Sequence, residues 1–308
     1  MPAAQLNALS LQEVRARLKS PSGLRFDIGP FRVCVSSRLP DIAKHVLEMY
    51  GSYALADSGY ADLHFSVDTP PGLRGLWRKQ VNFRFDDEYP FKPLPFAQAR
   101  PFFEWGLNWC IATTAHQFLI IHAAVVAKGD HCALIPGRPG AGKSTLCAAL
   151  VASGWRLLSD EMALIALDSG SIWPVPRPIS LKNASIDVIG QRHPETVFSP
   201  SFTDTHKGTV AHMRAPDASV RDSGRPAQAR WVVYPAYQAG AALEVSPVTP
   251  CQSTLRLADD SFNLPLLGGR GFEALAEMAC HCHSYTLRYS SLDEAIAWFD
   301  KQSEAGMQ

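Results

Sequence analysis

The stretch of sequence that decides the fold reads Gly-Arg-Pro-Gly-Ala-Gly-Lys-Ser and runs from Gly137 to Ser144. It matches the pattern G-x-x-x-x-G-K-[S/T] at every fixed position. The apolar run from His131 to Ile135 predicts a strand before it, and the residues from Ser144 to Ala152 predict a helix after it. A strand, a glycine-rich loop and a helix in this order predict a phosphate-binding loop. The alternative is a glycine-rich loop that matches by chance.

The residue types in this loop suit the binding of a nucleoside triphosphate. Glycine permits the backbone turns that point N–H groups at phosphate oxygens, and the N-terminus of the following helix adds positive potential. We expect Lys143 to reach the β- and γ-phosphates and the hydroxyl of Ser144 to ligate Mg²⁺. The residues expected to contact the nucleotide are Gly137, Arg138, Pro139, Gly140, Ala141, Gly142, Lys143, Ser144 and Thr145.

An acidic pair, Asp160 and Glu161, follows the next predicted strand, from Trp155 to Leu158. Acids after an apolar strand predict a magnesium-binding Asp160 and a Glu161 that activates a water or a hydroxyl. Only one helix and one strand separate these acids from the loop, whereas many ATPases with such a loop place the second acid much farther along the chain. The alternative is a pair of carboxylates that merely ends a strand.

A single histidine, His122, interrupts the apolar stretch from Phe118 to Val126, which predicts one strand. A lone histidine in such a strand is more often a hydrogen-bonded core residue than a catalytic one. The residues alone therefore leave its role open.

Taken together, these elements resemble the catalytic domain of HPr kinase/phosphorylase. The resemblance rests on His122, the loop from Gly137 to Ser144, a helix that ends at Gly154, and the acidic pair. It is strongest to a divergent bacterial branch, the HPr-kinase-related proteins, of which the segments 178–183 and 205–212 also look typical. The match is good over residues 118–190, weak over the rest of the C-terminal half, and absent from the N-terminal third.

The resemblance implies an α/β (mixed α+β) P-loop fold akin to that of phosphoenolpyruvate carboxykinase. It implies that the γ-phosphoryl group of ATP, with Mg²⁺ bound, passes to a hydroxyl of a protein, a peptide or a small molecule. By position, Glu161 matches the catalytic acid/base of the family, Asp160 the acid before it, and His122 the active-site histidine. Lys143 would neutralise phosphate charge. The family is oligomeric, so the resemblance suggests a homo-oligomer that the sequence itself does not reveal.

Two departures from the family pattern bear on activity. Glu161 is one methylene longer than the aspartate of the family. Ser180 falls near the position of a magnesium-binding glutamate, so metal binding would rest on Ser144 and Asp160 alone. The segment that the family uses for the reverse, dephosphorylating reaction is not recognisable in this sequence.

A group of cations follows the acidic pair and includes Lys182, His206, Lys207, His212 and Arg214. Such side chains suit a loop that holds substrate or closes over phosphates, because cations neutralise the charge that develops in phosphoryl transfer. The alternative is a solvated polar loop. Residues 190–228 are rich in Pro, Ser, Thr, His and Arg, so we expect them to form a long loop.

The chain of 308 residues is long enough for about two domains. We expect a small α+β domain or extension over residues 1–95 and the P-loop domain over residues 96–308. Lys plus Arg and Asp plus Glu both number 29, and this balance argues against a nucleic-acid or anionic membrane surface. Residues 1–10 do not follow the basic-then-apolar pattern of a signal peptide, no apolar run reaches the length of a membrane span, and the seven cysteines are scattered, so we expect a cytoplasmic protein.

Several readings remain open from the sequence. An NTPase that couples hydrolysis to a conformational change would use Glu161 to activate water. A nucleotide-responsive binding protein would turn over little ATP. The sequence does not separate ATP from GTP or pyrophosphate as the donor. The run Cys280-His281-Cys282-His283 suggests zinc, but no second ligand pair accompanies it, which favours a helix-to-strand junction.

Overall fold

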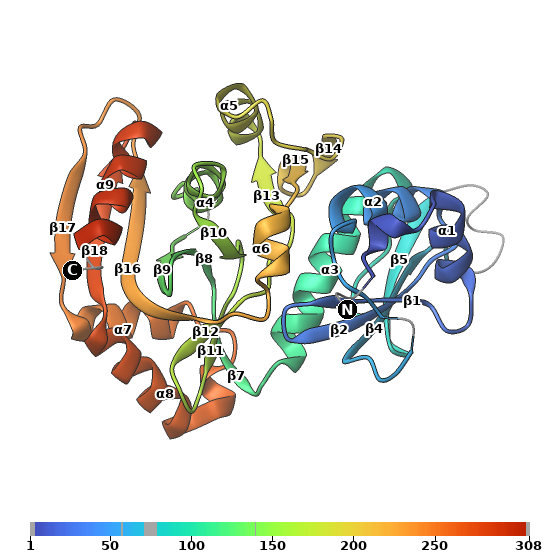
Figure 1. Ribbon diagram of the computed structural model, residues 1–308, viewed down its shortest axis with the longest axis horizontal. Helices are drawn as coiled ribbons and strands as arrows, with labels where there is room; N and C mark the ends of the chain where they lie inside the picture. The colour runs from blue at the N-terminus through green and yellow to red at the C-terminus, as the bar shows by residue number, and fades with distance from the viewer. Residues whose placement is uncertain (1–3, 57, 71–78, 139, 306–308) are drawn as a thin grey trace.

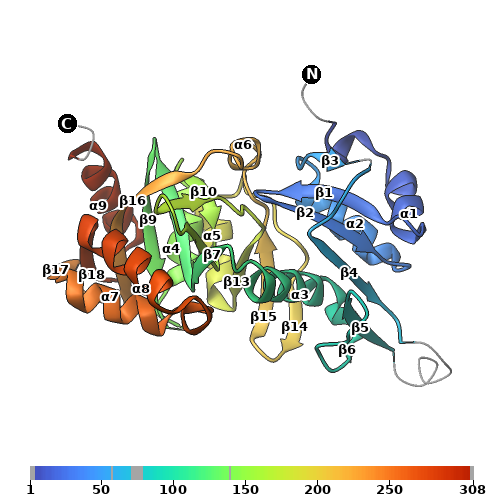
Figure 2. The ribbon, with the colours of Figure 1, turned by 90° about the horizontal axis from the view of Figure 1, so that it is seen from below.

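The computed structural model describes residues 4–56, 58–70, 79–138 and 140–305. Helices and strands gather in two parts along the long axis of the molecule (Figures 1 and 2). An N-terminal sheet with its helices lies at one end, and a larger C-terminal part, which ends in helix α9 (Leu292–Ala305), lies at the other. The chain is therefore a mixed α/β protein.

The N-terminal part is built on a sheet of six strands within the described residues. In order across the sheet these are β3 (Leu55–Ala56), β1 (Leu24–Ile28), β2 (Phe31–Ser36), β4 (Leu63–Asp68), β5 (Gln80–Phe85) and β6 (Leu94–Pro95). Its helices are η1 (Leu6–Ala8), α1 (Leu11–Lys19), α2 (Pro40–Tyr50), η3 (Phe96–Gln98) and α3 (Ala99–Thr114). Alternating apolar residues over 24–28, 31–36, 63–67 and 81–85 predict strands, and the capping box from Ser10 predicts a helix; these are confirmed, whereas β3, β6 and α2 were not predicted.

Helix α3 belongs by its packing to this N-terminal sheet. It contacts β4, β5 and α2, and Phe103 and Leu107 on its inner face are fully buried. The apolar residues from Pro101 to Ala115 predict a buried core helix, and α3 confirms it. One hydrophobic core runs on from this helix into the C-terminal part, where the ring of Phe118 lies 6.3 Å from that of Phe31.

The C-terminal part is organised around a sheet of nine strands, counted over the described residues. Seven of these strands lie side by side in this order across the sheet: β10 (Arg156–Ser159), β8 (Ala123–Lys128), β9 (His131–Pro136), β16 (Ala227–Tyr237), β12 (Ser171–Trp173), β11 (Ala163–Ala166) and β7 (Phe118–Ile121). Strand β18 (His283–Tyr289) pairs with β16, and β17 (Glu244–Val248) pairs with β18. The remaining helices are α4 (Lys143–Ala152), α5 (Ala184–Arg192), α6 (Asp217–Arg221), α7 (Pro250–Asp259) and α8 (Leu264–His281).

Helices cover both faces of this sheet. Helix α4 packs on β8, β9 and β10, and α9 packs on β18. On the other face, α8 packs on β7 and β16 and α7 packs against α8. Ile120 belongs to the core on the α4 side, whereas its neighbours Leu119 and Ile121 belong to the core on the α7 and α8 side. This alternation is what a strand buried on both faces requires.

Strand register brings the motifs of the sequence to one edge of the sheet. Ala123, at the start of β8, pairs with Pro136, the last residue of β9 before the glycine-rich loop. Ser159, the last residue of β10 before the acidic pair, pairs with Val125 of β8. His122 immediately precedes β8 and therefore lies at the same edge.

The stretch from Phe118 to Val126 is not the single strand that we predicted. The chain bends at His122, and the two halves join different partners: β7 pairs with β11, whereas β8 pairs with β9 and β10. The backbone N–H of His122 donates to the carbonyl of Asp260, and Ile121 bridges to Ser261. A contact with a segment far along the chain makes this break, so local sequence could not predict it.

The prediction of a long loop over residues 190–228 is wrong. This region holds the hairpin of β14 (Phe202–Thr205) and β15 (Gly208–Met213), the helix α6 and the start of β16. Strand β15 also pairs with β13 (Ile179–Lys182) to form a third sheet, in the order β13-β15-β14. The sequence predicts a helix from Phe272 to about Cys280; in the structure this helix, α8, begins earlier, at Leu264, and its backbone breaks at Gly268. The polar composition of this region predicts a loop. Only a few residues of each element are buried and make its packing contacts, so composition did not reveal the elements.

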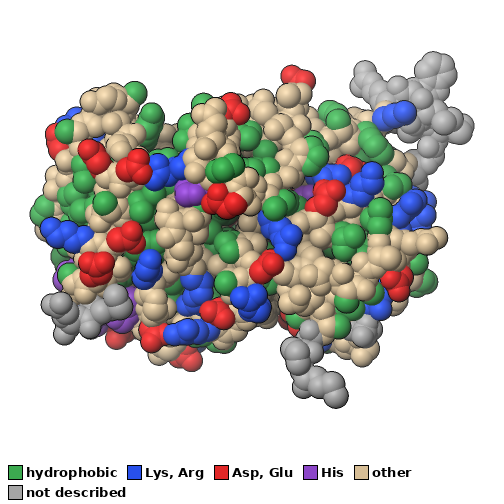
Figure 3. Space-filling view, turned by 45° about the horizontal axis from the view of Figure 1, so that its top comes forward, with side chains coloured by type: hydrophobic (Ala, Val, Ile, Leu, Met, Phe, Trp, Pro, Cys, Tyr) green, Lys and Arg blue, Asp and Glu red, His purple; other side chains and the backbone are tan. Residues whose placement is uncertain are grey.

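None of the helices in the described residues is long and apolar enough to cross a membrane. On the face drawn in Figure 3, Lys and Arg side chains are interspersed with Asp and Glu side chains. This face therefore carries no broad surface of one charge.

Candidate functional site

The glycine-rich loop is held in place by the ends of two strands. The backbone N–H of Tyr237, at the end of β16, donates to the carbonyl of Ala141, and the hydroxyl of Tyr289, at the end of β18, lies 3.5 Å from the carbonyl of Gly142. Gly140 and Gly142 have φ angles of +90° and +91°, a region that glycine enters without strain. Gly142 is the N-cap of α4, so the loop leads directly into a helix N-terminus.

Three predicted residues meet beside this loop. Nζ of Lys143 lies 2.7 Å from Nε2 of His122, and the same ring nitrogen lies 3.3 Å from Oε2 of Glu161. The side chains of His122 and Glu161 are 31% and 22% exposed, so both are accessible to a ligand. The structure therefore places His122 in the site and not in the core.

Charges around Glu161 keep it ionised. Burial alone would raise its pKa, but the hydrogen bond with His122 and the positive charges of Lys143 and Lys207 lower it to about 2. Burial in turn lowers the pKa of both lysines, against the attraction of Glu161. The site thus holds one acid between two cations, and Glu161 is better suited to accepting a hydrogen bond than to removing a proton early in a reaction.

Asp160 is buried, and only one of its two carboxylate oxygens has a hydrogen-bond partner in the described part of the chain. Its Oδ2 accepts a hydrogen bond from the backbone N–H of Ser180 at 3.0 Å, whereas its Oδ1 has no partner among the described residues. Burial and the neighbouring Glu161 raise its pKa to about 6, while Lys143, the Ser180 amide and the hydroxyl of Ser144 act in the opposite direction. A free carboxylate oxygen next to a serine hydroxyl fits a Mg²⁺ ion, which prefers oxygen ligands.

A small cavity of about 90 Å³ adjoins Glu161. Its walls come from α3, from the segment that leads into β13 and from the β14–β15 hairpin, and comprise Glu104, Trp105, Asn108, Glu161, Arg177, Pro178, Ser180, Lys207 and His212. We call this the inner cavity. Most of these side chains are polar or charged, so the inner cavity suits a polar group of a ligand.

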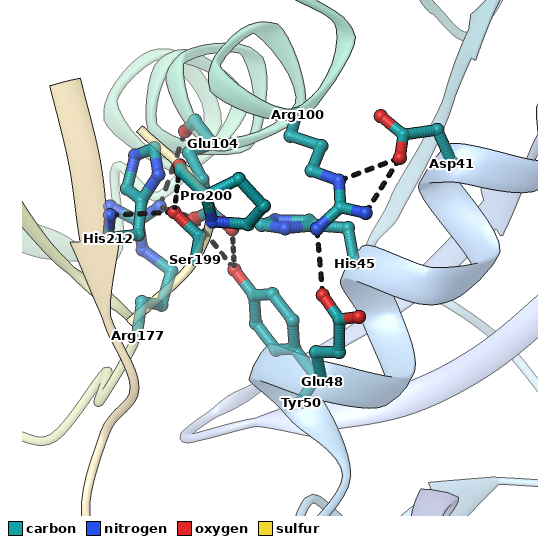
Figure 4. Close-up of polar contacts among 10 residues, drawn as sticks. All are labelled: Asp41, His45, Glu48, Tyr50, Arg100, Glu104, Arg177, Ser199, Pro200 and His212. Atoms are coloured by element: carbon teal, nitrogen blue, oxygen red, sulfur yellow. Dashed lines mark hydrogen bonds and ion pairs between the residues drawn. The ribbon is translucent and has the colours of Figure 1, made fainter. Parts of the chain in front are cut away.

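Glu104 anchors the back wall of the inner cavity in a polar network (Figure 4). Its carboxylate accepts hydrogen bonds from the hydroxyl of Tyr50, at 2.9 and 2.8 Å, and pairs with Nε2 of His45 at 2.7 Å and with Nη1 of Arg177 at 3.5 Å. Burial would raise the pKa of Glu104, but His45, His212 and Arg177 hold it below the usual range. The network joins α2 and α3 to the walls that carry Arg177 and His212, so the N-terminal part helps to shape the site.

The cations that we predicted near the substrate fall into separate places. Lys207 lines the inner cavity, and the charge of Lys182 lies close enough to lower the pKa of Lys143 and Lys207. His212 is fully buried at the cavity wall. His206 is exposed and packs on Trp105, 4.6 Å between ring centroids, and Arg214 pairs with Asp217 at 2.6 Å. Pro139 lies outside the described residues.

Sequence reasoning missed Glu104, Asn108 and Arg177. One signal was available: Glu104 is a lone acid inside the apolar run from Phe102 to Leu107. A charge in such a helix is buried only with partners, which indicates a site or an ion pair. Arg177 lies between prolines and gave no signal.

Comparison with known proteins finds no family model that matches the chain and no curated protein that matches it. The function must therefore be inferred from the residues and their geometry.

Proposed function

We propose that this protein is an HPr-kinase-like phosphotransferase that passes the γ-phosphoryl group of ATP to a hydroxyl. One observation carries the proposal: Glu161 lies at the junction between the glycine-rich loop and a polar cavity. On one side its carboxylate contacts His122, which contacts Lys143, and on the other it lines the inner cavity. A residue in this place can touch an acceptor hydroxyl while the γ-phosphate occupies the loop.

The roles of the residues follow from phosphoryl transfer chemistry. The acceptor oxygen forms a bond to the γ-phosphorus, the bond from that phosphorus to the bridging oxygen breaks, and ADP leaves with the electron pair. Lys143 and the N–H groups of the loop stabilise the phosphate oxygens. Glu161 orients the acceptor hydroxyl and receives its proton as the new bond forms. Because the transition state is loose, orientation contributes more than base strength, which agrees with the low pKa of Glu161.

Magnesium has a place in this arrangement. Ser144 and Asp160 would hold the ion, with the unpartnered Oδ1 of Asp160 as a free ligand within the described part of the chain. When bound, Mg²⁺ would neutralise charge on the β- and γ-phosphates.

The proposal is tested with ATP labelled at the γ-phosphorus and a panel of serine peptides and small alcohols. Substitution Lys143→Ala should lower transfer by about 10²-fold or more, since one charged donor to the transferring group is lost. Substitutions Glu161→Gln and Asp160→Asn should each lower it comparably. If phosphoryl transfer is lost in Lys143→Ala but fully retained in both Glu161→Gln and Asp160→Asn, the assigned roles are contradicted.

Two rival functions predict other outcomes in the same assay. An NTPase with Glu161 acting on water would hydrolyse ATP rapidly without any acceptor. A nucleotide-responsive binding protein would bind ATP tightly with neither hydrolysis nor transfer.

A further inference from the structure

A second and larger cavity, of about 550 Å³, lies beside the inner cavity. Its walls are mainly apolar and include the aromatic side chains of Phe91, Phe102, Trp105, Trp109 and Phe262. We call it the outer cavity. Its volume is within the range of about 300–1,000 Å³ that is usual for small-molecule sites.

One face of α3 forms a wall of the outer cavity. Phe102, Trp105, Trp109 and Ala112 recur at helical spacing and line it. The opposite face of α3 is buried against the N-terminal sheet. The helix is therefore apolar on both sides. On the second side Phe102 is buried, whereas Trp105, Trp109 and Ala112 are only partly buried and line the cavity. Such a surface is unfavourable in water and indicates a binding function.

The outer cavity is continuous with the proposed catalytic site. Trp105, Asn108 and Lys207 line both cavities. Nζ of Lys207 lies 5.2 Å from the centroid of the Trp105 ring, so this cation lies at the boundary between them. On another wall, the ring of Phe262 lies 5.5 Å from the ring of His122. A molecule in the outer cavity would therefore contact side chains that touch the site itself.

The residues that line the inner cavity, by contrast, include buried polar atoms without hydrogen-bond partners in the part of the chain that the structure describes. Nε of Arg177, the hydroxyl of Ser180 and both ring nitrogens of His212 have none within the described residues. These side chains belong to residues that are 6%, 8% and 0% exposed, respectively. A buried polar atom without a hydrogen bond is unfavourable, so a ligand whose polar groups reach these atoms as the lining side chains adjust would be stabilised.

We propose that the two cavities form one acceptor site for a small alcohol with an apolar body. The hydroxyl end of this molecule, with a further polar group, enters the inner cavity beside Glu161, and its aromatic or aliphatic body fills the outer cavity. The inference rests on the proposed kinase function. A small molecule fits better than a serine on a folded protein, because the adjoining outer cavity, of about 550 Å³ with mainly apolar walls, has the size and lining of a small-molecule site.

The test uses 2-(1-naphthyl)ethanol as a probe and two matched variants of the full chain. Thr113 and Thr114 are neighbouring exposed residues near the end of α3, but only Thr113 lines the outer cavity. Substitution Thr113→Trp should fill the cavity and weaken probe binding, measured by calorimetry, by about tenfold or more. Substitution Thr114→Trp should leave binding as in the wild type. Thermal unfolding of both variants checks that each folds.

Labelled ATP is then supplied with the probe, with glycerol and with an unstructured glycine-rich serine peptide. Preferential transfer to the probe that is lost in Thr113→Trp supports the inference. If the probe binds saturably and Thr113→Trp blocks this binding, but no phosphoryl transfer to any acceptor occurs, the result supports the cavity assignment and contradicts the kinase function. If the probe does not bind, but phosphoryl transfer to glycerol or to the peptide occurs and is the same in Thr113→Trp, the inference is overturned and the kinase function is retained.

Discussion

Nζ of Lys143 lies 2.7 Å from Nε2 of His122, so the lysine of the glycine-rich loop contacts a ring nitrogen of this histidine. An ammonium group can only donate a hydrogen bond, so this nitrogen accepts and carries no proton while the contact lasts. The same nitrogen lies 3.3 Å from the carboxylate of Glu161, to which it can only donate. It cannot serve both neighbours at once, so the position of Lys143 is coupled to the proton on His122.

We therefore expect nucleotide binding to change the protonated nitrogen of His122. When Lys143 turns to the phosphates, His122 can adopt the tautomer with its hydrogen on Nε2, which donates a hydrogen bond to the carboxylate of Glu161. Nitrogen-15 NMR of the imidazole rings, with a non-hydrolysable ATP analogue, should show Nε2 of His122 shift from its unprotonated to its protonated form. Substitution Lys143→Met should give the protonated form without nucleotide. An unprotonated Nε2 in that variant would contradict the coupling.

We expect the ionised carboxylate of Asp160 to lower the free energy of unfolding when no metal ion is bound. Its pKa is raised to about 6 in the folded state, so the folded state loses stability relative to the unfolded state as the pH rises through that value. Substitution Asp160→Asn should therefore stabilise the protein by about 1–3 kcal/mol at pH 7.5, with the gain fading toward pH 4. Urea unfolding in EDTA measures this. The exposed Asp259 offers the control Asp259→Asn, which should change little at either pH.

His212 should make the protein sensitive to mild acid. Burial lowers its pKa from 6.5 to about 4, so between these values the unfolded state binds the extra proton and folding stability falls as the pH falls. Between pH 7 and pH 5 this contribution is about 2 kcal/mol. In the variant His212→Gln, urea unfolding should show a smaller loss over that interval, whereas in His281→Gln, at an exposed site, the loss should match the wild type. Equal losses in both variants would contradict the role of His212.

The sequence predicted the parts of the site that lie close together along the chain. The loop from Gly137 to Ser144, the helix after it and the acidic pair were all visible, because a phosphate loop needs glycines, a lysine and a following helix within a few residues. The bend at His122 was not visible, because a hydrogen bond to Asp260 produces it. Nor was the inner cavity, because Glu104 and Arg177 are brought together only by tertiary packing.

Gly142 connects the loop to the strand ends and offers a sharp test of the nucleotide site. Its φ is +91°, and a Cβ there would lie 2.7 Å from the hydroxyl oxygen of Tyr289. Substitution Gly142→Ala should therefore add a steric clash to the backbone strain of about 1 kcal/mol and lower ATP affinity, measured by calorimetry, by about tenfold or more. The matched control Gly154→Ala has the same type of strain, with φ +96°, but no neighbour within 4 Å among the described residues, so it should lower stability and leave ATP affinity unchanged. Adding Tyr289→Phe to Gly142→Ala removes the clashing oxygen and should restore part of the affinity. A double variant no better than Gly142→Ala would show that the strain of the loop, and not the contact with Tyr289, limits binding.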